Sequence, residues 1–322
     1  MKDLTFLALK ETLPTIKKNV LLKNHTTFRI GGPAKYFLIA QKKEQVIKAL
    51  QLAKKLNIPF FILGGGSNVL VADKGFNGLV IKIQNKNPKF TVKKGNTIEV
   101  LAGVLVKDVV KFTTTRGLQG LEWAGGLPGT FGGAVRGNAG AFGAETKDLI
   151  VKVQALDNNI KLRTLSNKQC QFSYRSSIFK KKNWIILSAT IQCKKGDKKK
   201  LQEIAESHIN YRKEKHPLEY PNAGSIFKNV DFKIISPKFQ KLFLDKVKKD
   251  PFLIVPSAWF IIGAGLTGKK IGQAQISKKH SNYIVNRGNA KAKDVVVIIE
   301  SSKKHIKKIY GIELEQEVQY LD

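Results

Sequence analysis

The sequence is poor in the residues that mark several classes of protein. Only two cysteines, Cys170 and Cys193, occur in 322 residues, too few for a disulfide framework and wrongly spaced for a metal knuckle. We therefore expect both to be small buried hydrophobic residues, and we expect no metal site. No apolar run reaches the roughly 18 to 20 residues of a membrane span, so we expect no insertion into a membrane.

Acidic residues are also scarce. There are 24 Asp and Glu against 57 Lys and Arg, which gives a formal net charge of +33. Such an excess is typical of nucleic-acid-binding proteins, because Lys and Arg neutralise phosphates. The lysines, however, are scattered along the whole chain without interleaved aromatic residues or a nucleic-acid motif. A lysine bias on solvated faces, or attraction of anionic ligands, explains them better, and nucleic-acid binding is kept as the alternative from another class.

The N-terminus lacks the features of a signal peptide. Asp3 and Glu11 interrupt its apolar residues, and no small-residue cleavage site is present. We therefore expect a cytoplasmic protein. Its 322 residues exceed one ordinary domain of about 100 to 200 residues, and 42% apolar content favours a globular chain.

Apolar periodicity indicates alternating helices and strands. A helix is expected over 44–56, because Val46, Ile47, Leu50 and Ala53 follow a 3.6-residue period. Further helices are expected over 106–116 and 294–309 and in the charged stretch around 198–217, and strands over 59–63, 69–71, 79–83, 90–92 and 98–101. Residues 313–320 alternate as a strand, which would place Glu313, Glu315 and Glu317 on one face. We expect three domains, over residues 19–80, 81–200 and 211–310, followed by a C-terminal strand in 311–322.

Glycine gathers in two places. The turn Gly64 to Asn68 lies between two strands and lacks the strand-to-helix context of a dinucleotide fingerprint. It suits either a tight hairpin, which the turn alone favours, or an anion-binding nest of backbone N–H groups.

The run 117–143 combines many glycines with Trp123, Phe131 and Phe142. A ligand laid along bare backbone explains this composition best. Gly125-Gly126, Gly132-Gly133 and Gly140 would then present amides to a pyrophosphate, and Pro128 would stiffen the turn.

Seven ordered motifs carry a family resemblance. GLEWAGGLPGTFGGAVRGNAGAFGAE at 120–145 resembles the flavin-binding signature of the UDP-N-acetylenolpyruvoylglucosamine reductase family, and NHTTFRIGGPA at 24–34 and LGGGSNVLV at 63–71 are similar to its two earlier signatures. FSYRSSIFK at 172–180, PNAGSIFKN at 221–229, GAGLTGKKIGQAQISKKHSNYIVN at 263–286 and GIELEQEV at 311–318 match in the same order. The spacing of Arg175 and Ser225 resembles the shorter subtype, which lacks a tyrosine loop over the substrate.

The resemblance implies both a fold and a reaction. The fold is α+β, with an FAD-binding part of the vanillyl-alcohol-oxidase (PCMH) type in two subdomains and a C-terminal α+β substrate-binding domain. FAD would be noncovalent, since the glycine-rich signature contains no His or Cys. NADPH would be the co-substrate in the reduction of UDP-N-acetylglucosamine enolpyruvate to UDP-N-acetylmuramate, a cytoplasmic step of peptidoglycan precursor synthesis that supports cell shape and division. The chain would act as a monomer. Another FAD oxidoreductase of the same fold is the alternative within enzymes.

Three residues match the family's catalytic positions. Hydride addition to an alkene leaves carbanion character that needs a cation, a proton donor and hydrogen-bonding partners. The resemblance assigns the cation to Arg175, the proton donor to Ser225 and the carboxylate to Glu317. Without the motifs these would read as a surface arginine, a turn serine and a solvated glutamate. A serine hydroxyl is a poor acid, so we expect Arg175 or Lys228 to lower the cost of its ionisation and Glu317 to orient it.

The remaining site residues also follow from the resemblance. The cofactor set shares the glycine-rich signatures and comprises Arg29, Gly64, Gly65, Gly66, Ser67, Asn68, Pro128, Gly129, Gly132, Gly133, Asn138, Ala139 and Gly140. The substrate set comprises Tyr174, Lys215, Lys228, Asn229 and His280.

Two positions depart from the family pattern. Val230 replaces a proline that commonly follows F-K-N. Lys291 stands where a helix-capping threonine is usual, so the last helix is expected to begin less firmly.

Overall fold

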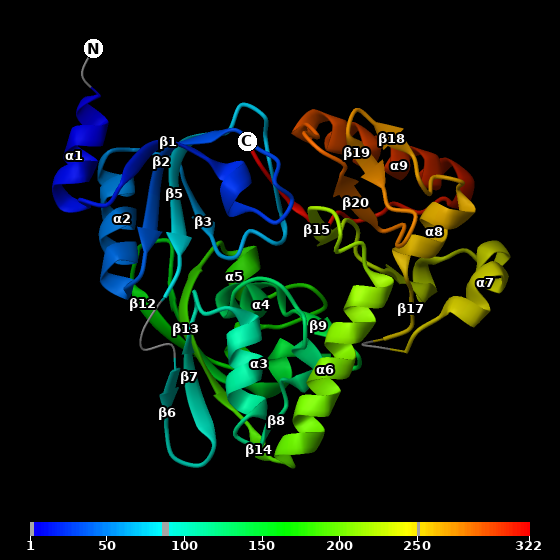
Figure 1. The fold of residues 1–322 in the computed structure, drawn as a ribbon, viewed down its shortest axis with the longest axis horizontal. Helices are drawn as coiled ribbons and strands as arrows, with labels where there is room; N and C mark the ends of the chain where they lie inside the picture. Colours follow the sequence, from blue (N-terminus) through cyan, green and yellow to red (C-terminus); the bar gives the residue numbers. More distant parts are fainter. Residues whose placement is uncertain (1–2, 86–89, 250–251) are drawn as a thin grey trace. The chain divides into compact units, whose positions relative to one another are not determined.

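The amphipathic helix expected over 44–56 forms as α2 (Lys43–Lys55) and runs along a sheet (Figure 1). The strand order is β1 (Lys17–Leu21), β2 (Pro33–Ala40), β5 (Phe76–Ile83) and β3 (Phe60–Leu63), and β2 and β3 both pair with β5 in parallel. Val46 and Leu50 of α2 share a core with Leu79 and Ile81 of β5. The 3.6-residue period predicted this helix correctly, because its apolar stripe packs against strands that are buried on that face.

The computed structural model describes residues 3–85, 90–249 and 252–322. The chain divides into two units. Unit 1 consists of Met1–Val20, Ala34–Gly65 and Phe76–Tyr211, and unit 2 of Leu21–Pro33, Gly66–Gly75 and Arg212–Asp322. Two early segments thus belong with the C-terminal third of the chain. The finer domain boundaries expected from the sequence stay a prediction.

A second, antiparallel sheet lies in unit 1. Its order is β12 (Leu162–Ser166), β11 (Ile150–Leu156), β13 (Ile185–Gln192), β7 (Thr97–Leu101) and β6 (Phe90–Val92). Helices α3 (Val106–Thr114) and α4 (Phe131–Gly137) contribute Val109 and Phe131 to its core. Shorter elements of this unit are α1 (Leu4–Thr12), β8 (Leu118–Gln119), η2 (Glu122–Ala124), β9 (Gly140–Ala141), β10 (Ala144–Glu145), η3 (Thr146–Leu149), η4 (Lys168–Cys170), α5 (Ile178–Lys181) and β14 (Lys194–Lys195).

The two cysteines are buried, as the sequence analysis expected. Both are buried free thiols in the core of this second sheet. Burial raises the pKa of Cys170 to about 12 and that of Cys193 to about 11. Because the thiolate is the reactive form, neither residue is a nucleophile at neutral pH.

Unit 2 contains an antiparallel sheet with α9 against it (Figure 1). The strand order is β15 (Asn222–Ser225), β20 (Tyr283–Asn286), β19 (Ala274–Ile276) and β18 (Lys270–Ile271), and α9 is Ala292–Tyr310. Further elements are η1 (Leu22–His25), β4 (Val69–Val71), β16 (Val230–Asp231), η5 (Phe232–Ile234), α7 (Pro237–Phe243), η6 (Leu244–Lys246), β17 (Ile254–Val255), α8 (Ser257–Gly263) and β21 (Gln319–Leu321). Helix α6 (Lys198–Lys215) begins in unit 1 and ends in unit 2.

Two local expectations are wrong. The strands beside the first glycine turn do not form a hairpin, since β3 pairs with β5 and β4 pairs in parallel with β21. The strand expected over 313–320 is reduced to β21, preceded by one isolated bridge between Phe227 and Gln316. Leu314 and Val318 are buried but Tyr320 is 45% exposed, so the alternation ends before the paired strand begins.

Helix α9 is capped at its start by a residue that the sequence analysis did not consider. Lys291 supplies no side-chain hydrogen bond as a cap, but the Asp73 carboxylate accepts from the N–H groups of Ala292 at 2.8 Å and Lys293 at 3.1 Å. A residue 219 positions away thus caps this helix.

None of the helices in the three described ranges combines the length and the apolar character that crossing a bilayer requires.

Candidate functional site

Each unit holds part of the expected site. In unit 1 are Gly64, Gly65, Pro128, Gly129, Gly132, Gly133, Asn138, Ala139, Gly140, Tyr174 and Arg175. In unit 2 are Arg29, Gly66, Ser67, Asn68, Lys215, Ser225, Lys228, Asn229, His280 and Glu317. We describe the two sets separately.

Two glycine-rich segments of unit 1 meet backbone to backbone. A Cβ atom on Gly65 would lie 2.6 Å from the Gly129 Cα, and one on Gly64 would lie 2.5 Å from the Thr130 Oγ1. A side chain at Gly65 would therefore displace the backbone of the neighbouring segment, and one at Gly64 would displace the Thr130 side chain. The fold brings together two stretches of the expected cofactor set that are 64 positions apart in the sequence.

Not every glycine in the second stretch is left for a ligand. A Cβ on Gly125 would lie 2.2 Å from the Ala205 carbonyl oxygen, and one on Gly132 would lie 2.7 Å from the Ala102 Cβ. The Gly125 amide donates to Glu122 at 3.1 Å and the Gly132 amide to Ala102 at 2.8 Å. Protein packing therefore explains these two glycines, and their N–H groups are already hydrogen-bonded within the protein.

The neighbouring Gly133 has a different environment. It is exposed, and a Cβ there would have the Thr130 Oγ1, at 3.5 Å, as its only neighbour within 4 Å among the described residues. Bare backbone beside the contact of Gly65 with Gly129 suits the close approach of a flat or phosphate-bearing cofactor. The residues of unit 1 thus fit FAD.

Arg175 is presented on a tight turn. Ser173 and Ser176 exchange backbone hydrogen bonds of 3.1 and 3.0 Å, and Arg175 takes the left-handed conformation between them, with φ of 52°. Its guanidinium donates to the Gly140 carbonyl at 2.9 Å and lies 5.0 Å from the Tyr174 ring centroid. The expected catalytic arginine and an expected cofactor glycine are therefore in direct contact.

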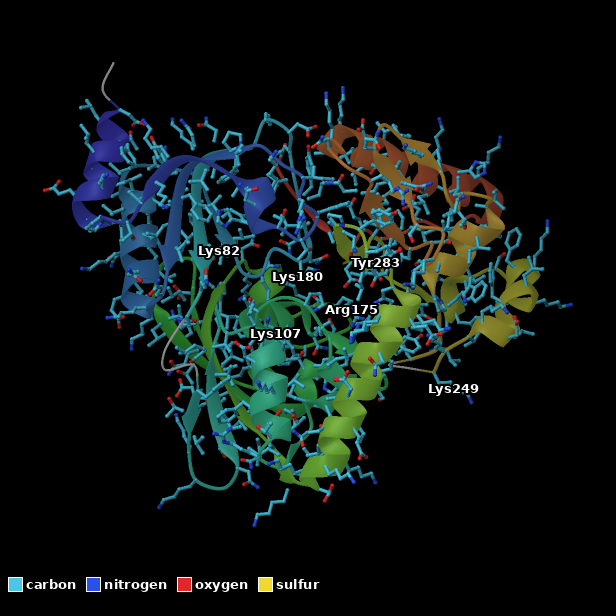
Figure 2. All side chains as sticks on the ribbon, in the orientation of Figure 1. Lys82, Lys107, Arg175, Lys180, Lys249 and Tyr283 are labelled. Atoms are coloured by element: carbon cyan, nitrogen blue, oxygen red, sulfur yellow. The ribbon has the colours of Figure 1, made fainter. Side chains whose placement is uncertain are left out.

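Lys180 and Asn138 hold this turn. The Lys180 ammonium, labelled with Arg175 in Figure 2, donates to the Arg175 carbonyl at 3.0 Å. Asn138 is fully buried, donates to the Ser173 carbonyl at 3.1 Å and accepts from the Lys147 amide at 3.0 Å. Its side chain is thus used to brace the turn that carries Arg175, a function that the sequence motif did not reveal.

Ser225 lies at the end of β15, opposite Tyr283 of β20. Gly224 precedes it with φ of 78°, and the register of the two strands is irregular between Asn222 and Ser225. A glycine allows this left-handed backbone cheaply, and the resulting bulge redirects the next side chain.

Glu317 is fixed beside Ser225 through its backbone. Its N–H donates 2.8 Å to the carbonyl of Ile226, the residue after Ser225. Its own carbonyl accepts from the Asn68 side chain at 3.1 Å. Unit 2 therefore brings together the expected proton donor, the expected carboxylate and one member of the expected cofactor set.

Lys228 does not match the role expected for it beside Ser225. Its ammonium, only 14% exposed, forms an ion pair with Glu315, and its N–H donates to the Glu315 carbonyl at 2.9 Å. Because the cation is already paired with a carboxylate, the expectation that it eases ionisation of the serine is not supported by this geometry.

An aromatic cluster surrounds His280, in which Tyr283 is buried and the two histidines are half-buried. The His280 ring lies 4.7 Å from that of Tyr283 and 5.6 Å from that of His216, and the Tyr283 hydroxyl is 3.2 Å from the His216 Nδ1. Burial lowers the pKa of His280, and burial with the nearby His280 and Arg212 lowers that of His216 to about 4. Both imidazoles are therefore neutral at neutral pH.

Tyr283, labelled in Figure 2, connects this cluster to Ser225, its register partner on β15. Burial raises the pKa of Tyr283 to about 12, Arg212 and a hydrogen bond with the Ser225 side chain act in the opposite direction, and Glu317 adds to the rise. The sequence analysis missed Tyr283 and His216. A tyrosine in the apolar strand YIVN and a histidine at the end of a helix look like structural residues until the strand register is known.

The other expected ligand residues are less enclosed. Lys215 pairs with the adjacent Glu214 at 2.6 Å, both side chains more than half exposed, and Asn229 accepts a 3.4 Å bond from the Ser257 amide. Arg29, with φ of 54°, lines a cavity of about 820 Å³ in unit 2 together with Lys23 and Arg287.

Comparison with known proteins gives the same assignment. Residues 34–166 match the family model of an FAD binding domain, and residues 216–321 match that of the UDP-N-acetylenolpyruvoylglucosamine reductase C-terminal domain. Relatives named UDP-N-acetylenolpyruvoylglucosamine reductase include one from Clostridium novyi, 38% identical over 94% of this chain and 91% of its own length, and one from Caldanaerobacter subterraneus, 38% identical over 93% and 91%.

A solved structure supports the fold. The UDP-N-acetylenolpyruvylglucosamine reductase (MurB) of Thermus caldophilus is similar with a TM-score of 0.74 and 27% identity, over 95% of this chain and all of the other. The fold and the cofactor segments define an FAD-binding oxidoreductase of α+β architecture, as the sequence predicted. The chain belongs to the UDP-N-acetylenolpyruvoylglucosamine reductase family.

Proposed function

We propose that this chain reduces UDP-N-acetylglucosamine enolpyruvate to UDP-N-acetylmuramate, with NADPH as the electron donor. Family membership over more than nine-tenths of the chain supports the reaction. The observation that carries it within the molecule is the hydrogen bond from the Glu317 amide to the carbonyl of Ile226, the residue after Ser225.

FAD, when bound, supplies a centre that takes a hydride from NADPH and delivers it to the enolpyruvyl carbon. Residues of unit 1 would hold it through the backbone of Gly64, Gly65, Gly129 and Gly133. The contact of Arg175 with Gly140 would keep the guanidinium beside this backbone surface. The other residues proposed for the cofactor are Pro128, Gly132, Asn138, Ala139 and Gly140 in unit 1 and Arg29, Gly66, Ser67 and Asn68 in unit 2. Gly132 would offer only its bare backbone, since its N–H donates to Ala102.

The protein side chains have separate tasks in this proposal. Arg175 offers a planar fork for the carboxylate or enolate that develops on the substrate. Ser225 Oγ–H gives its proton to the neighbouring carbanion carbon, and Glu317 orients that hydroxyl. Neutral His280, with Tyr174, Lys215 and Asn229, would bind the nucleotide sugar. Lys228 would join them only by exchanging its Glu315 partner for an anionic group.

The test separates the two half-reactions. The purified flavoprotein is reduced anaerobically with NADPH and then mixed with the enolpyruvyl UDP-sugar while flavin absorbance is followed. The proposal requires the oxidised flavin colour to return, with one UDP-N-acetylmuramate formed per flavin. Reduction by NADPH without reoxidation by this substrate would show a different electron acceptor.

Ser225→Ala sharpens the assignment. The variant should be reduced by NADPH within about twofold of the wild-type rate, while reoxidation by substrate falls by about 100-fold or more, in the range of general acid catalysis. A matched control is Ser236→Ala on η5–α7, since Ser236 provides no side-chain cap to that helix. Equal losses in both half-reactions would remove Ser225 from the proton-donating role.

The proposal also covers the setting of the enzyme. We expect it to act as a single copy in the cytoplasm, without a nucleic-acid partner. Its expected functional parts are two FAD-binding subdomains over 19–80 and 81–200 and a substrate-binding domain over 211–310, with Glu317 on the final segment. Light scattering during gel filtration tests the single copy, because a dimer would double the 35.9 kDa mass of the chain.

A further inference from the structure

Ser225, Tyr283 and His216 form a continuous polar line through unit 2. Ser225 and Tyr283 are register partners on β15 and β20, and the Ser225 hydroxyl is close enough to the phenol to act against the rise of the Tyr283 pKa. The Tyr283 hydroxyl lies 3.2 Å from the His216 Nδ1. Tyr283 is 7% exposed, so this phenol has little access to water and depends on these two partners.

The two rings behind Tyr283 are well fixed. The His216 amide donates to the Arg212 carbonyl at 2.9 Å, which anchors the histidine to the end of α6. The His216 and Tyr283 rings are 5.2 Å apart, and His280 packs edge-on against both. His280 is itself held, since its Nδ1 accepts from the Asn282 amide at 3.3 Å. Both histidines beside the phenol are therefore held by hydrogen bonds to backbone groups.

The hydrogen bonds along this line can have either direction. A neutral imidazole has one N–H donor and one acceptor nitrogen, so His216 can accept from Tyr283 or donate to it. If the His216 Nδ1–H donates to the phenol oxygen, the Tyr283 O–H is directed to Ser225 Oγ. Ser225 Oγ then accepts a hydrogen bond from Tyr283, and the Ser225 O–H remains able to donate to the substrate.

We propose that Tyr283, oriented by His216, is a positioning residue that donates to Ser225 Oγ and stabilises the alkoxide formed when Ser225 protonates the reduced substrate. This inference rests on the proposed function and deepens it. In the step, the Ser225 O–H bond breaks, a C–H bond forms at the carbanion carbon, and the bonding pair stays on Oγ. The alkoxide, held by the Tyr283 O–H, takes a proton from water to restore the hydroxyl.

Charged groups around the line come from several elements. Arg212 of α6 acts on both Tyr283 and His216, Glu317 acts on Tyr283, and Lys279 acts on His216. Lys248 acts on His280. Burial is the largest influence on the pKa of Tyr283 and on that of His216. It keeps Tyr283 protonated and His216 neutral across the neutral range. The phenol therefore remains a donor wherever the enzyme is assayed near pH 7.

Tyr283→Phe removes the hydroxyl and keeps the ring. Reoxidation of the reduced flavin by the enolpyruvyl UDP-sugar should slow by about 10- to 100-fold, the range for one hydrogen bond to a charged group. Reduction by NADPH should stay within about twofold, and KM for the UDP-sugar within about threefold. Tyr310→Phe, at an 8% exposed tyrosine in the core of the same unit, is the matched control and should change neither half-reaction. A Tyr283→Phe variant that reoxidises at the wild-type rate would overturn the proposal.

A double variant tests whether Tyr283 acts through the serine. Ser225→Ala already lacks the oxygen that the phenol would stabilise, so Ser225→Ala with Tyr283→Phe should reoxidise no more slowly than Ser225→Ala alone. A merely structural role for Tyr283 would instead multiply the two losses. Full multiplication would therefore contradict the proposed positioning.

A measurement without substrate keeps this inference distinct from the proposed function. In holoenzyme labelled with ¹⁵N-histidine, the His216 Nδ1 resonance, assigned by its loss in His216→Gln, should shift in Tyr283→Phe and not in Tyr310→Phe. An unmoved resonance would overturn the line itself. If that resonance shifts but wild-type flavin is not reoxidised by the enolpyruvyl substrate, the proposed function fails, and the step assigned to Ser225 and Tyr283 fails with it.

Discussion

The Asn138 side-chain amide donates a 3.1 Å hydrogen bond to the Ser173 carbonyl, which fixes the first residue of the turn that presents Arg175. The same side chain accepts from the Lys147 amide at 3.0 Å, and Asn138 itself has a left-handed φ of 43°. Asparagine is one of the few residues other than glycine that adopts this conformation readily. A glycine-rich motif thus contains a residue whose side chain supports the neighbouring turn, on which Arg175 lies.

Asn138→Ala should therefore destabilise unit 1 and misplace Arg175. We expect a loss of about 2 to 4 kcal/mol in the free energy of unfolding, because two part-buried backbone groups lose their partner and alanine disfavours the left-handed conformation. At saturating FAD, reoxidation by substrate should also fall. Urea unfolding and the two half-reactions measure these effects.

Asn57→Ala is the control for that variant. Asn57 has a similar φ of 50° but is exposed on unit 1. It should cost no more than about 1 kcal/mol, since only the conformational preference is lost. Equal losses in the two variants would mean that the hydrogen bonds of Asn138 contribute nothing beyond its backbone conformation.

A second prediction concerns the meeting of the two glycine-rich segments. In Gly65→Ala the new Cβ would lie 2.6 Å from the Gly129 Cα, so one segment must move away from the other. We expect FAD affinity to fall by at least about tenfold, or 1.4 kcal/mol. Flavin fluorescence during titration of the apoenzyme measures the affinity.

Gly137→Ala is a suitable comparison. A Cβ on Gly137, at the end of α4, has no described atom within 4 Å, and its φ does not require glycine. It should leave FAD affinity within about twofold and stabilise the helix by about 0.5 to 1 kcal/mol. A Gly65→Ala enzyme that binds FAD as well as Gly137→Ala would show that the close contact is not needed for cofactor binding.

The sequence predicted best the parts of the fold that depend on local patterns. Helices α2 and α3 and strand β7 lie where apolar periodicity placed them, because their buried faces are formed by their own residues. It failed where the partner is distant. Nothing near β3 and β4 indicates that one pairs with β5 and the other with β21, so the glycine turn between them looked like a hairpin.

The site shows the same division. Motifs identified Arg175, Ser225 and Glu317, and the fold explains how the last two come together. They did not identify Tyr283 or His216, because only the register of β15 with β20 places the phenol beside the serine. Conversely, several signature glycines that suggested ligand contacts are required by neighbouring backbone.

The cap of α9 gives a third prediction. Asp73→Ala removes the acceptor for the Ala292 and Lys293 amides and should cost about 1 to 2 kcal/mol in the free energy of unfolding. Asp73→Asn keeps one acceptor oxygen and should lose less than half as much. Urea unfolding monitored by circular dichroism compares the two, and equal losses would show that charge, not hydrogen bonding, is what Asp73 contributes.

The last prediction follows from the neutral state of His216. Burial lowers its pKa in the folded protein to about 4, below the ordinary 6.5. Between these two values the unfolded chain binds a proton at this position and the folded chain does not, so stability must fall as pH drops from about 6.5 towards 4. His216→Gln cannot titrate, and its free energy of unfolding should fall less steeply over this window. His280, whose pKa burial also lowers, leaves part of the slope in place. His305→Gln, at an exposed position of α9, is the control and should reproduce the wild-type profile, and parallel profiles for all three proteins would contradict burial of a neutral His216.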